Sequence, residues 1–324
     1  MINLASPAIA PEYGSPEWVA DRRNYVGASD VPMLVGESPY GGPLDLWQQK
    51  IGLVTVETTH AMQRGHIYED ATVQEFGLLF PGFRFERAET RAHPAGDFLR
   101  ATPDRIIITP SGERLICEVK QVTPHLKDRY GESGTDDAPG YNLVQVQTQC
   151  EVFDLDAAFL LVNFGYELRH YFVRRDREIG QYIVEASHDF MQRVRAGIPP
   201  EVTSADTYEA ITLRFAGPTK ETIAADEETA ALVEEFAAVK AAKEAAKERE
   251  DELRSLLAAR IGRAYGIDAG AAGRVLWPES KGKTSFDTDG LIRDLKIPAD
   301  VLQKYTRLGA PYRTMRHYPA KSRT

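Results

Sequence analysis

The sequence predicts an α/β fold in which a central mixed sheet is flanked by helices. Two stretches, residues 101–121 and 157–174, have the composition of β-hairpins, with β-branched and apolar runs on either side of a turn. Apolar residues recur at steps of three and four in three further stretches, residues 62–80, 141–153 and 179–194. We therefore expect residues 1–197 to form one core of alternating helices and hairpins.

The first elements of this core are short. Residues 16–23 are expected to form a helix, and Ser29 or Asp30 is a suitable N-cap for a second helix at 31–35. The free N–H groups of a helix start can receive a phosphate, and Arg22 lies just upstream as a bidentate phosphate ligand. A plain N-cap beside a surface arginine is the alternative interpretation.

Residues 44–51 and 62–80 are predicted to be the next helices. In the second of these, Glu69 lies within the apolar stripe. A carboxylate on an apolar helix face is costly unless a cation meets it. Glu69 is therefore a candidate metal ligand, and a buried salt bridge to an arginine such as Arg64 is the alternative.

The hairpin at residues 101–121 carries the main chemical pattern of the chain. Its first strand follows Asp104, and its second strand contains Glu118 and Lys120. Side chains alternate between the faces of a strand, so Glu118 and Lys120 lie on the same face. Asp104 arrives beside them from the partner strand.

These residues suit phosphodiester hydrolysis assisted by a divalent cation. Asp104 and Glu118 supply hard oxygen ligands for Mg²⁺, and the carbonyl of Val119 could add another. Lys120 would hold or deprotonate the attacking water and offset negative charge in the transition state. A surface hairpin with a solvated charged face is the alternative.

Composition limits the class of protein. The chain has 324 residues, 43% hydrophobic and 27% charged, and it lacks an apolar run long enough to span a membrane or to form a secretory signal. We expect a cytoplasmic protein, in which Cys117 and Cys150 are reduced, buried thiols. The net charge of −9 opposes indiscriminate binding to nucleic acid. A DNA substrate would require basic groups concentrated in one channel.

Five motifs occur in an order that resembles a known family. They are Arg22 with Gly27-Ala28-Ser29-Asp30, Gly65-x-x-Tyr68-Glu69, Thr102-Pro103-Asp104, Glu118-Val119-Lys120, and Tyr141 followed by Gln145-Val146-Gln147. The set resembles the YqaJ-type viral recombinases, a group that is similar to lambda exonuclease and belongs to the PD-(D/E)XK nuclease superfamily. The resemblance covers residues 15–195.

This resemblance implies a PD-(D/E)XK restriction-endonuclease-like core at residues 1–197 and a phage or prophage origin in a bacterial host. It also implies a 5′-to-3′ exonuclease that uses Mg²⁺, with Mn²⁺ as an alternative and two ions expected. Such an enzyme acts on ends of double-stranded DNA and leaves a 3′ single strand for an annealing protein. Members of the group often assemble as a homo-oligomeric ring around DNA, which the sequence itself does not show.

The resemblance also implies roles for individual residues. The metal ligands would be Glu69, Asp104, Glu118 and the carbonyl of Val119, and Lys120 would be the catalytic lysine. The residues that bind the substrate, chiefly its 5′-phosphate, would be Arg22, Ser29, Thr102, Gln145 and Gln147.

Beyond residue 197 the composition changes. Residues 198–223 are predicted to be a linker, and residues 224–261 a long helix rich in Ala, Glu and Lys. Strands at 265–278 and 309–319 around a short helix at 288–295 would complete a C-terminal helical and small α+β module, residues 224–324. Basic residues near the end could grip DNA or form a solvated tail: Arg313, Arg316, His317, Lys321 and Arg323.

Three functions are compatible with these observations. The first is the 5′-to-3′ exonuclease, and the second is an endonuclease on the same core, because a fold does not dictate which phosphodiester is cut. The third is a DNA-binding or protein-binding module without catalysis, which the intact set of Asp104, Glu118 and Lys120 argues against. Cleavage of closed circular DNA would favour the second function.

Overall fold

The computed structural model describes residues 15–306, except residues 57, 218, 220, 283, 284 and 286. The chain divides into two compact units, Met1–Ala216 and Gly217–Thr324. The strand predicted at 309–319 and the basic residues from Arg313 to Arg323 lie outside the described residues.

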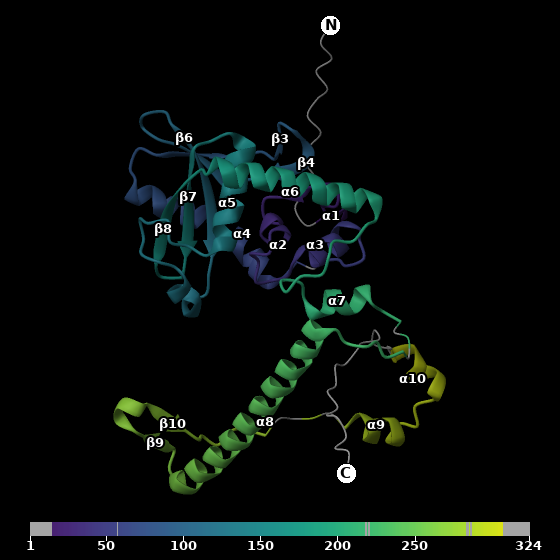
Figure 1. The fold of residues 1–324 in the computed structure, drawn as a ribbon. Helices are drawn as coiled ribbons and strands as arrows, with labels where there is room; N and C mark the ends of the chain where they lie inside the picture. Colours follow the sequence, from purple (N-terminus) through teal and green to yellow (C-terminus); the bar gives the residue numbers. More distant parts are fainter. Residues whose placement is uncertain are drawn as a thin grey trace. The chain divides into compact units, whose positions relative to one another are not determined.

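The first unit is built on a five-stranded sheet with the order β2-β5-β6-β7-β8. Among these strands, Figure 1 labels β6, β7 and β8. Its strands are β2 (Arg84–Arg87), β5 (Arg105–Ile108), β6 (Arg114–Gln121), β7 (Ala157–Asn163) and β8 (Leu168–Arg174). β6 and β7 are parallel, and the other neighbours are antiparallel. Both predicted hairpins, β5–β6 and β7–β8, are therefore confirmed, as is the mixed sheet.

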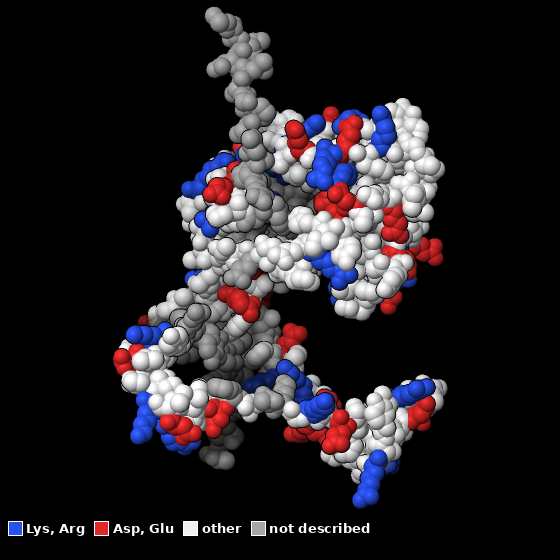
Figure 2. Space-filling model, turned by 180° about the vertical axis from the view of Figure 1, so that it is seen from behind, with Lys and Arg blue, Asp and Glu red and all other residues white. Residues whose placement is uncertain are grey.

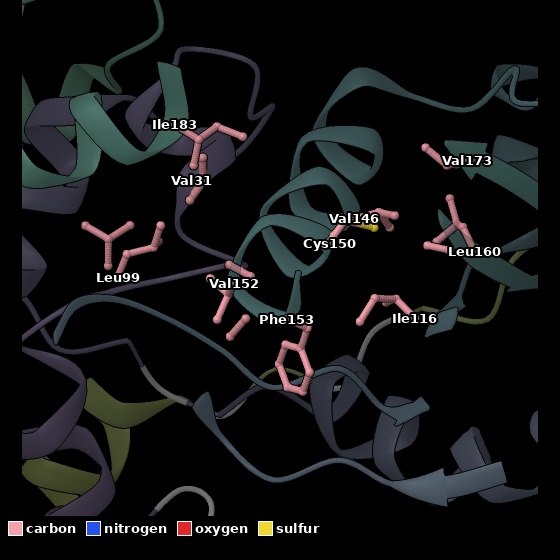
Figure 3. Close-up of a cluster of buried hydrophobic side chains, with 14 of the residues drawn as sticks. Val31, Leu99, Ile116, Val146, Cys150, Val152, Phe153, Leu160, Val173 and Ile183 are labelled. Atoms are coloured by element: carbon pink, nitrogen blue, oxygen red, sulfur yellow. The ribbon is translucent and has the colours of Figure 1, made fainter. Parts of the chain in front are cut away.

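Helices cover both faces of this sheet, as the alternation of side chains along β6 requires. Ile116 packs towards α5 (Gly140–Phe153) in one hydrophobic cluster, with Val146 and Cys150 (Figure 3). Cys117 points to the other face and packs with Phe76 of α4 (His60–Leu79). The two cysteines are free and buried, as predicted.

A smaller sheet with the order β1-β4-β3 lies on the α5 side of the unit. Its strands are β1 (Val26–Gly27), β3 (Arg91–His93) and β4 (Gly96–Ala101), and β1 runs parallel to β4. The helices of the N-terminal region are α1 (Pro16–Arg22), α2 (Val31–Leu34) and α3 (Pro43–Lys50). The helix α6 (Arg177–Ala196) packs against α5 and β4. A salt bridge from Arg100 of β4 to Asp21 holds the end of α1 beside this smaller sheet.

Part of the segment predicted as a linker, residues 198–223, packs onto the first unit. Asp206 Oδ1 accepts a hydrogen bond from the backbone N–H of Leu44 at 2.7 Å, and Gln48 donates to the carbonyl of Ala210 at 2.8 Å. Ala210 belongs to the short helix α7 (Tyr208–Arg214). The division between the compact units falls after Ala216, inside the predicted linker.

The second unit contains α8 (Glu227–Ile261), a helix of 35 residues whose side chains are mostly exposed. The stretch predicted as one strand at 265–278 is instead a hairpin, β9 (Gly266–Asp268) and β10 (Arg274–Leu276), joined by the 3₁₀ turn η2 (Gly270–Ala272). The helices α9 (Thr288–Asp294) and α10 (Ala299–Tyr305) follow. Within the described part of the chain, every helix is too short or too polar to cross a membrane.

Candidate active site

The C-terminal half of β6 carries the two charged residues that sequence alternation placed on one face. Lys120 Nζ lies 2.7 Å from Glu118 Oε1, so the two form an ion pair along the strand. The Glu118 side chain is only 5% exposed, whereas that of Lys120 is 26% exposed. The pair therefore extends from the core, where Glu118 lies, to a surface that solvent reaches at Lys120.

Two glutamines of α5 complete this ion pair from the facing helix. Gln145 Nε2 donates to Glu118 Oε1 at 2.6 Å, and Gln145 Oε1 accepts from Lys120 Nζ at 2.8 Å. Gln149, one turn later, donates to Glu118 Oε2 at 2.6 Å. Both carboxylate oxygens of Glu118 are thus held in fixed positions by α5.

Asp104 approaches the same strand from the end of β5. Its Oδ2 accepts a hydrogen bond from the backbone N–H of Val119 at 2.7 Å. Burial, together with the negative charges of Glu118 and Glu69, raises the pKa of Asp104 well above its ordinary value. The predicted convergence of Asp104, Glu118 and Lys120 is therefore present in the structure.

Glu69 of α4 is the third predicted carboxylate, and Arg105 pairs with it. The Arg105 guanidinium bonds to Glu69, to Asp70 and to the backbone carbonyl of Asp104. Arg64, the partner named from the sequence, instead lies over the ring of Tyr68 at 5.2 Å. Glu69 thus lies close enough to influence Asp104 while being held by a salt bridge.

Arg105 is a residue of this site that sequence reasoning missed. Its side chain is 8% exposed, which is unusual for an arginine and indicates that the ion pairs are structurally required. The available signal was its position directly after Asp104, at the start of an isoleucine run. A charged residue in a buried strand needs an acidic partner on the helix packed against it.

The chemistry of these side chains fits a hard divalent cation. Hard cations bind carboxylate oxygens, and Asp104, Glu118 and Glu69 lie near one another with their negative charges only partly offset by Lys120 and Arg105. Among the described residues, the carboxylates are not arranged as a preformed group of three metal ligands. Their hydrogen bonds to Gln145, Gln149 and Arg105 occupy the same oxygens, so binding of an ion would exchange some of these bonds.

Two of the predicted phosphate ligands, Arg22 and Ser29, lie together before α2. Arg22 Nη2 lies 3.3 Å from Ser29 Oγ and forms a salt bridge with Asp30. Asp30 precedes α2 but makes no capping bond to it, because its carboxylate is engaged by Arg22 and Lys50. Burial disfavours its charged form, yet the charges of Arg22 and Lys50 hold the pKa of Asp30 below its ordinary value. Asp30 therefore occupies the predicted N-cap position of α2, but its side chain makes no capping bond.

Thr102 and Gln147 do not join the cluster at Glu118. Thr102 is exposed, with its hydroxyl 2.8 Å from that of Thr90. Gln147 is buried, donates to the carbonyl of Arg174 at 2.7 Å and accepts from the N–H of Asp176 at 2.8 Å. Gln147 therefore links α5 to the end of β8. The resemblance had instead implied that Gln147 binds substrate.

The surface of the first unit carries charges of both signs. On the face drawn in Figure 2, lysine and arginine side chains are interspersed with aspartate and glutamate over this unit. The basic side chains at the candidate site are individual residues, Lys120 and Arg105, each paired with a carboxylate.

Comparisons with known proteins agree with the family predicted from the motifs. Residues 17–156 match the model of the YqaJ-like viral recombinase domain. The protein YqaJ of Bacillus subtilis is 28% identical over 206 residues, which cover 61% of this chain and 62% of YqaJ. The matched part thus spans less than two thirds of that relative. The predicted resemblance to YqaJ-type recombinases is confirmed.

Two solved structures are similar at low identity. The alkaline exonuclease from Laribacter hongkongensis is 18% identical, with a TM-score of 0.47 over 56% of this chain and 94% of that one. A phage-related exonuclease from Haemophilus somnus is 16% identical, with a TM-score of 0.41 over 53% of this chain and 96% of that one.

Proposed function

We propose that this chain is a metal-dependent nuclease of the PD-(D/E)XK type, which digests double-stranded DNA from its ends. The premise is the match of residues 17–156 to the YqaJ-like viral recombinase domain. The observation that carries the proposal is the convergence of Asp104, Glu118 and Lys120 at the end of β6. Two carboxylates and an amine in this arrangement supply what hydrolysis of a phosphodiester requires.

Lys120 has the properties of a residue that positions water and offsets charge. Burial lowers the pKa of its ammonium, but the charges of Glu118 and Asp104 outweigh burial, and the net effect is a raised pKa. Lys120 is therefore a cation at neutral pH in the metal-free protein. Its contacts with Glu118 and Gln145 aim the ammonium along β6, where it can donate to a water or to a phosphate oxygen.

The metal in this proposal is Mg²⁺, with Mn²⁺ as an alternative and two ions expected. Asp104, Glu118 and the carbonyl of Val119 would hold it, and Glu69 would be a further ligand. When bound, such an ion would supply Lewis-acid chemistry at the phosphate and at the attacking water. Asp104 is held by the backbone of Val119 and Glu118 by the α5 glutamines, and an ion would replace some of these bonds.

The direction of digestion follows from recognition of the end that is cut. In this proposal Arg22 and Ser29, with Thr102, receive the 5′-phosphate, and Gln145 contributes where it faces Lys120. Digestion would then run 5′ to 3′ and leave a 3′ single strand for an annealing protein. A ring of several copies around the duplex would keep the enzyme on its substrate.

The test is digestion of a linear duplex whose two strands carry different labels at their 5′ ends. The full chain with Mg²⁺ should release 5′-terminal nucleotides from each strand and leave closed circular DNA intact. Cleavage of the closed circle would favour an endonuclease. Binding of duplex without cleavage, with either Mg²⁺ or Mn²⁺, would overturn the enzymatic proposal.

A further inference from the structure

We propose that Asp30 and Lys50 are a buried positioning pair that fixes the guanidinium of Arg22 for a terminal 5′-phosphate. The inference rests on the proposed nuclease function and deepens it, because it assigns the preference for phosphorylated ends to residues that do not themselves reach the DNA. The pair lies at the junction of α1, β1 and α3 in the first unit.

The Asp30 carboxylate is the centre of this junction. Its Oδ1 binds Arg22, and its Oδ2 accepts from Lys50 Nζ at 2.7 Å and from the backbone N–H of Gly27 at 2.9 Å. Asp30 is 9% exposed, so these three donors replace water around a charge that is costly to bury. One carboxylate therefore links three elements of secondary structure.

Lys50 fixes the backbone as well as the carboxylate. Its ammonium donates to the backbone carbonyl of Arg22 at 2.7 Å, in addition to its bond with Asp30. The Lys50 side chain is only 4% exposed, whereas that of Arg22 is 23% exposed. Lys50 is thus inaccessible to a DNA end, and Arg22 is the cation of this group that a phosphate can reach.

The space around Arg22 is shaped to hold one orientation. Its guanidinium lies 5.5 Å from the ring centre of Trp18 and 5.7 Å from that of Tyr25. A Cβ atom at Gly27 would lie 2.0 Å from Arg22 Nη1, so a side chain at this position would displace the guanidinium. The aromatic rings, the bare backbone at Gly27 and the Asp30 carboxylate together restrict the side chain on several sides.

The balance of charge explains why this site would accept an anion. Arg22 and Lys50 contribute two positive charges, and Asp30 contributes one negative charge, so the group retains an excess of one positive charge. The neighbouring Arg100 is paired with two carboxylates, Asp21 and Asp97, so it adds no further positive excess. A phosphate at Arg22 would meet a cation whose remaining donors are already oriented.

The experiment compares Asp30→Asn, Lys50→Met and the double variant with the wild-type full chain. Each is assayed for kcat and KM on linear duplexes that carry either a 5′-phosphate or a 5′-hydroxyl. Binding of the same two duplexes is measured by fluorescence anisotropy with Ca²⁺ in place of Mg²⁺. The matched control is Asp97→Asn, which breaks a neighbouring arginine–aspartate pair at an exposed position.

We expect Asp30→Asn to reduce the preference for phosphorylated ends about tenfold, mainly through KM and binding, as for the loss of one charge-assisted hydrogen bond. Asp97→Asn should keep the preference. The double variant keeps the same excess of positive charge, so it should remain impaired if Arg22 must be positioned. Circular dichroism and thermal unfolding verify that each variant is folded.

The outcomes separate the inference from the function on which it rests. If the wild-type chain binds phosphorylated ends selectively but does not cut DNA, the nuclease proposal fails and the positioning pair is still tested by binding. A folded Asp30→Asn variant with an unchanged preference would overturn the inference. Recovery of the preference in the double variant would also overturn it, because charge alone would then be sufficient.

Discussion

The side-chain nitrogen of Gln149 lies 2.6 Å from Oε2 of Glu118, which joins α5 to β6 inside the first unit. Gln149 is 1% exposed and its other polar atom, Oε1, is buried without a hydrogen-bond partner among the described residues. A buried carbonyl oxygen without a hydrogen-bond partner costs free energy. The hydrogen bonding of Gln149 Oε1 therefore does not explain why this residue is buried here. The bond to Glu118 is the interaction that the residue supplies.

Gln149→Leu should therefore reduce catalysis more than its effect on stability explains. The substitution leaves Glu118 Oε2 without this donor, and we expect a loss of about 1–3 kcal/mol in the free energy of unfolding. We also expect kcat to fall at least tenfold. The matched control is Gln147→Leu, which removes a buried glutamine of the same helix that bonds only to the backbone of Arg174 and Asp176. Equal kcat in the two variants would contradict a role for Gln149 in positioning Glu118.

Lys120→Ala should abolish cleavage while duplex binding persists. The substitution removes the ammonium that lies between Glu118 and Gln145, and loss of one such charge-stabilising group typically lowers kcat by about 10²–10³-fold. Single-turnover digestion and anisotropy with Ca²⁺ measure the two properties separately. Lys120→Arg is the informative control, because a planar guanidinium does not reproduce an ammonium at this position. Residual cleavage near the wild-type rate would remove Lys120 from the mechanism.

Asp104→Asn should stabilise the metal-free protein and inactivate it. The pKa of Asp104 is raised in the folded state, so protonated Asp104 stabilises the folded protein at pH values below its ordinary pKa, about 3.9. This stabilisation is lost as the pH rises through the pKa of Asp104 in the folded state. At neutral pH the ionised group opposes folding, and an amide that still accepts from Val119 removes that charge. In EDTA we expect the Tm to rise about 2–4 °C, the shift that about 1 kcal/mol gives in a domain of this size.

The pH and metal dependence distinguish this explanation from a general effect of substitution. The gain in Tm should be larger at pH 8 than near pH 4.5, where wild-type Asp104 is protonated more often. Mg²⁺ should raise the Tm of the wild-type chain and have less effect on Asp104→Asn. A gain that is independent of pH would indicate that the charge of Asp104 is not its cause.

Arg22→Ala should selectively reduce digestion of 5′-phosphorylated ends. Arg22 is the accessible cation of the group formed with Asp30 and Lys50, so a hydroxyl end should depend on it much less. Comparison of kcat/KM on duplexes that differ only in the terminal phosphate measures this selectivity. An equal loss on phosphorylated and hydroxyl ends would show that Arg22 supports the fold or general DNA binding instead.

Local patterns in the sequence predicted the part of the site that depends on the alternation of side chains along one strand. Glu118 and Lys120 are two residues apart, so their common face was determined by the strand itself, and the hairpin turn brought Asp104 beside them. Gln145 was assigned to the phosphate pocket, whereas it contacts Glu118 and Lys120. The periodicity of a helix predicts the face on which a residue lies. It does not predict which side chain of another element that residue contacts.

Contacts between distant elements could not be predicted in this way. Arg105 meets Glu69 across 36 positions, and Lys50 meets Asp30 across 20, and neither spacing leaves a local signal. The helix at 62–80 was identified, but its expected inward stripe fails in the first half, where Met62 is 41% exposed. The short strands β3 and β4 were missed because their lengths and partly exposed faces give little periodicity.

The register of β6 has a consequence for how this protein can change in length. Ile116, Glu118 and Lys120 face α5, and Leu115, Cys117 and Val119 face α4. Insertion or deletion of one residue inside the strand would exchange the two sets and bury the charged groups against the phenylalanines beneath α4. A change in length at the turn around Gly112, whose φ is +84° and which has no neighbouring atom within 4 Å of an added Cβ, would leave the alternation within β6 intact. We therefore expect natural or engineered insertions and deletions in the turn of this hairpin and not within β5 or β6.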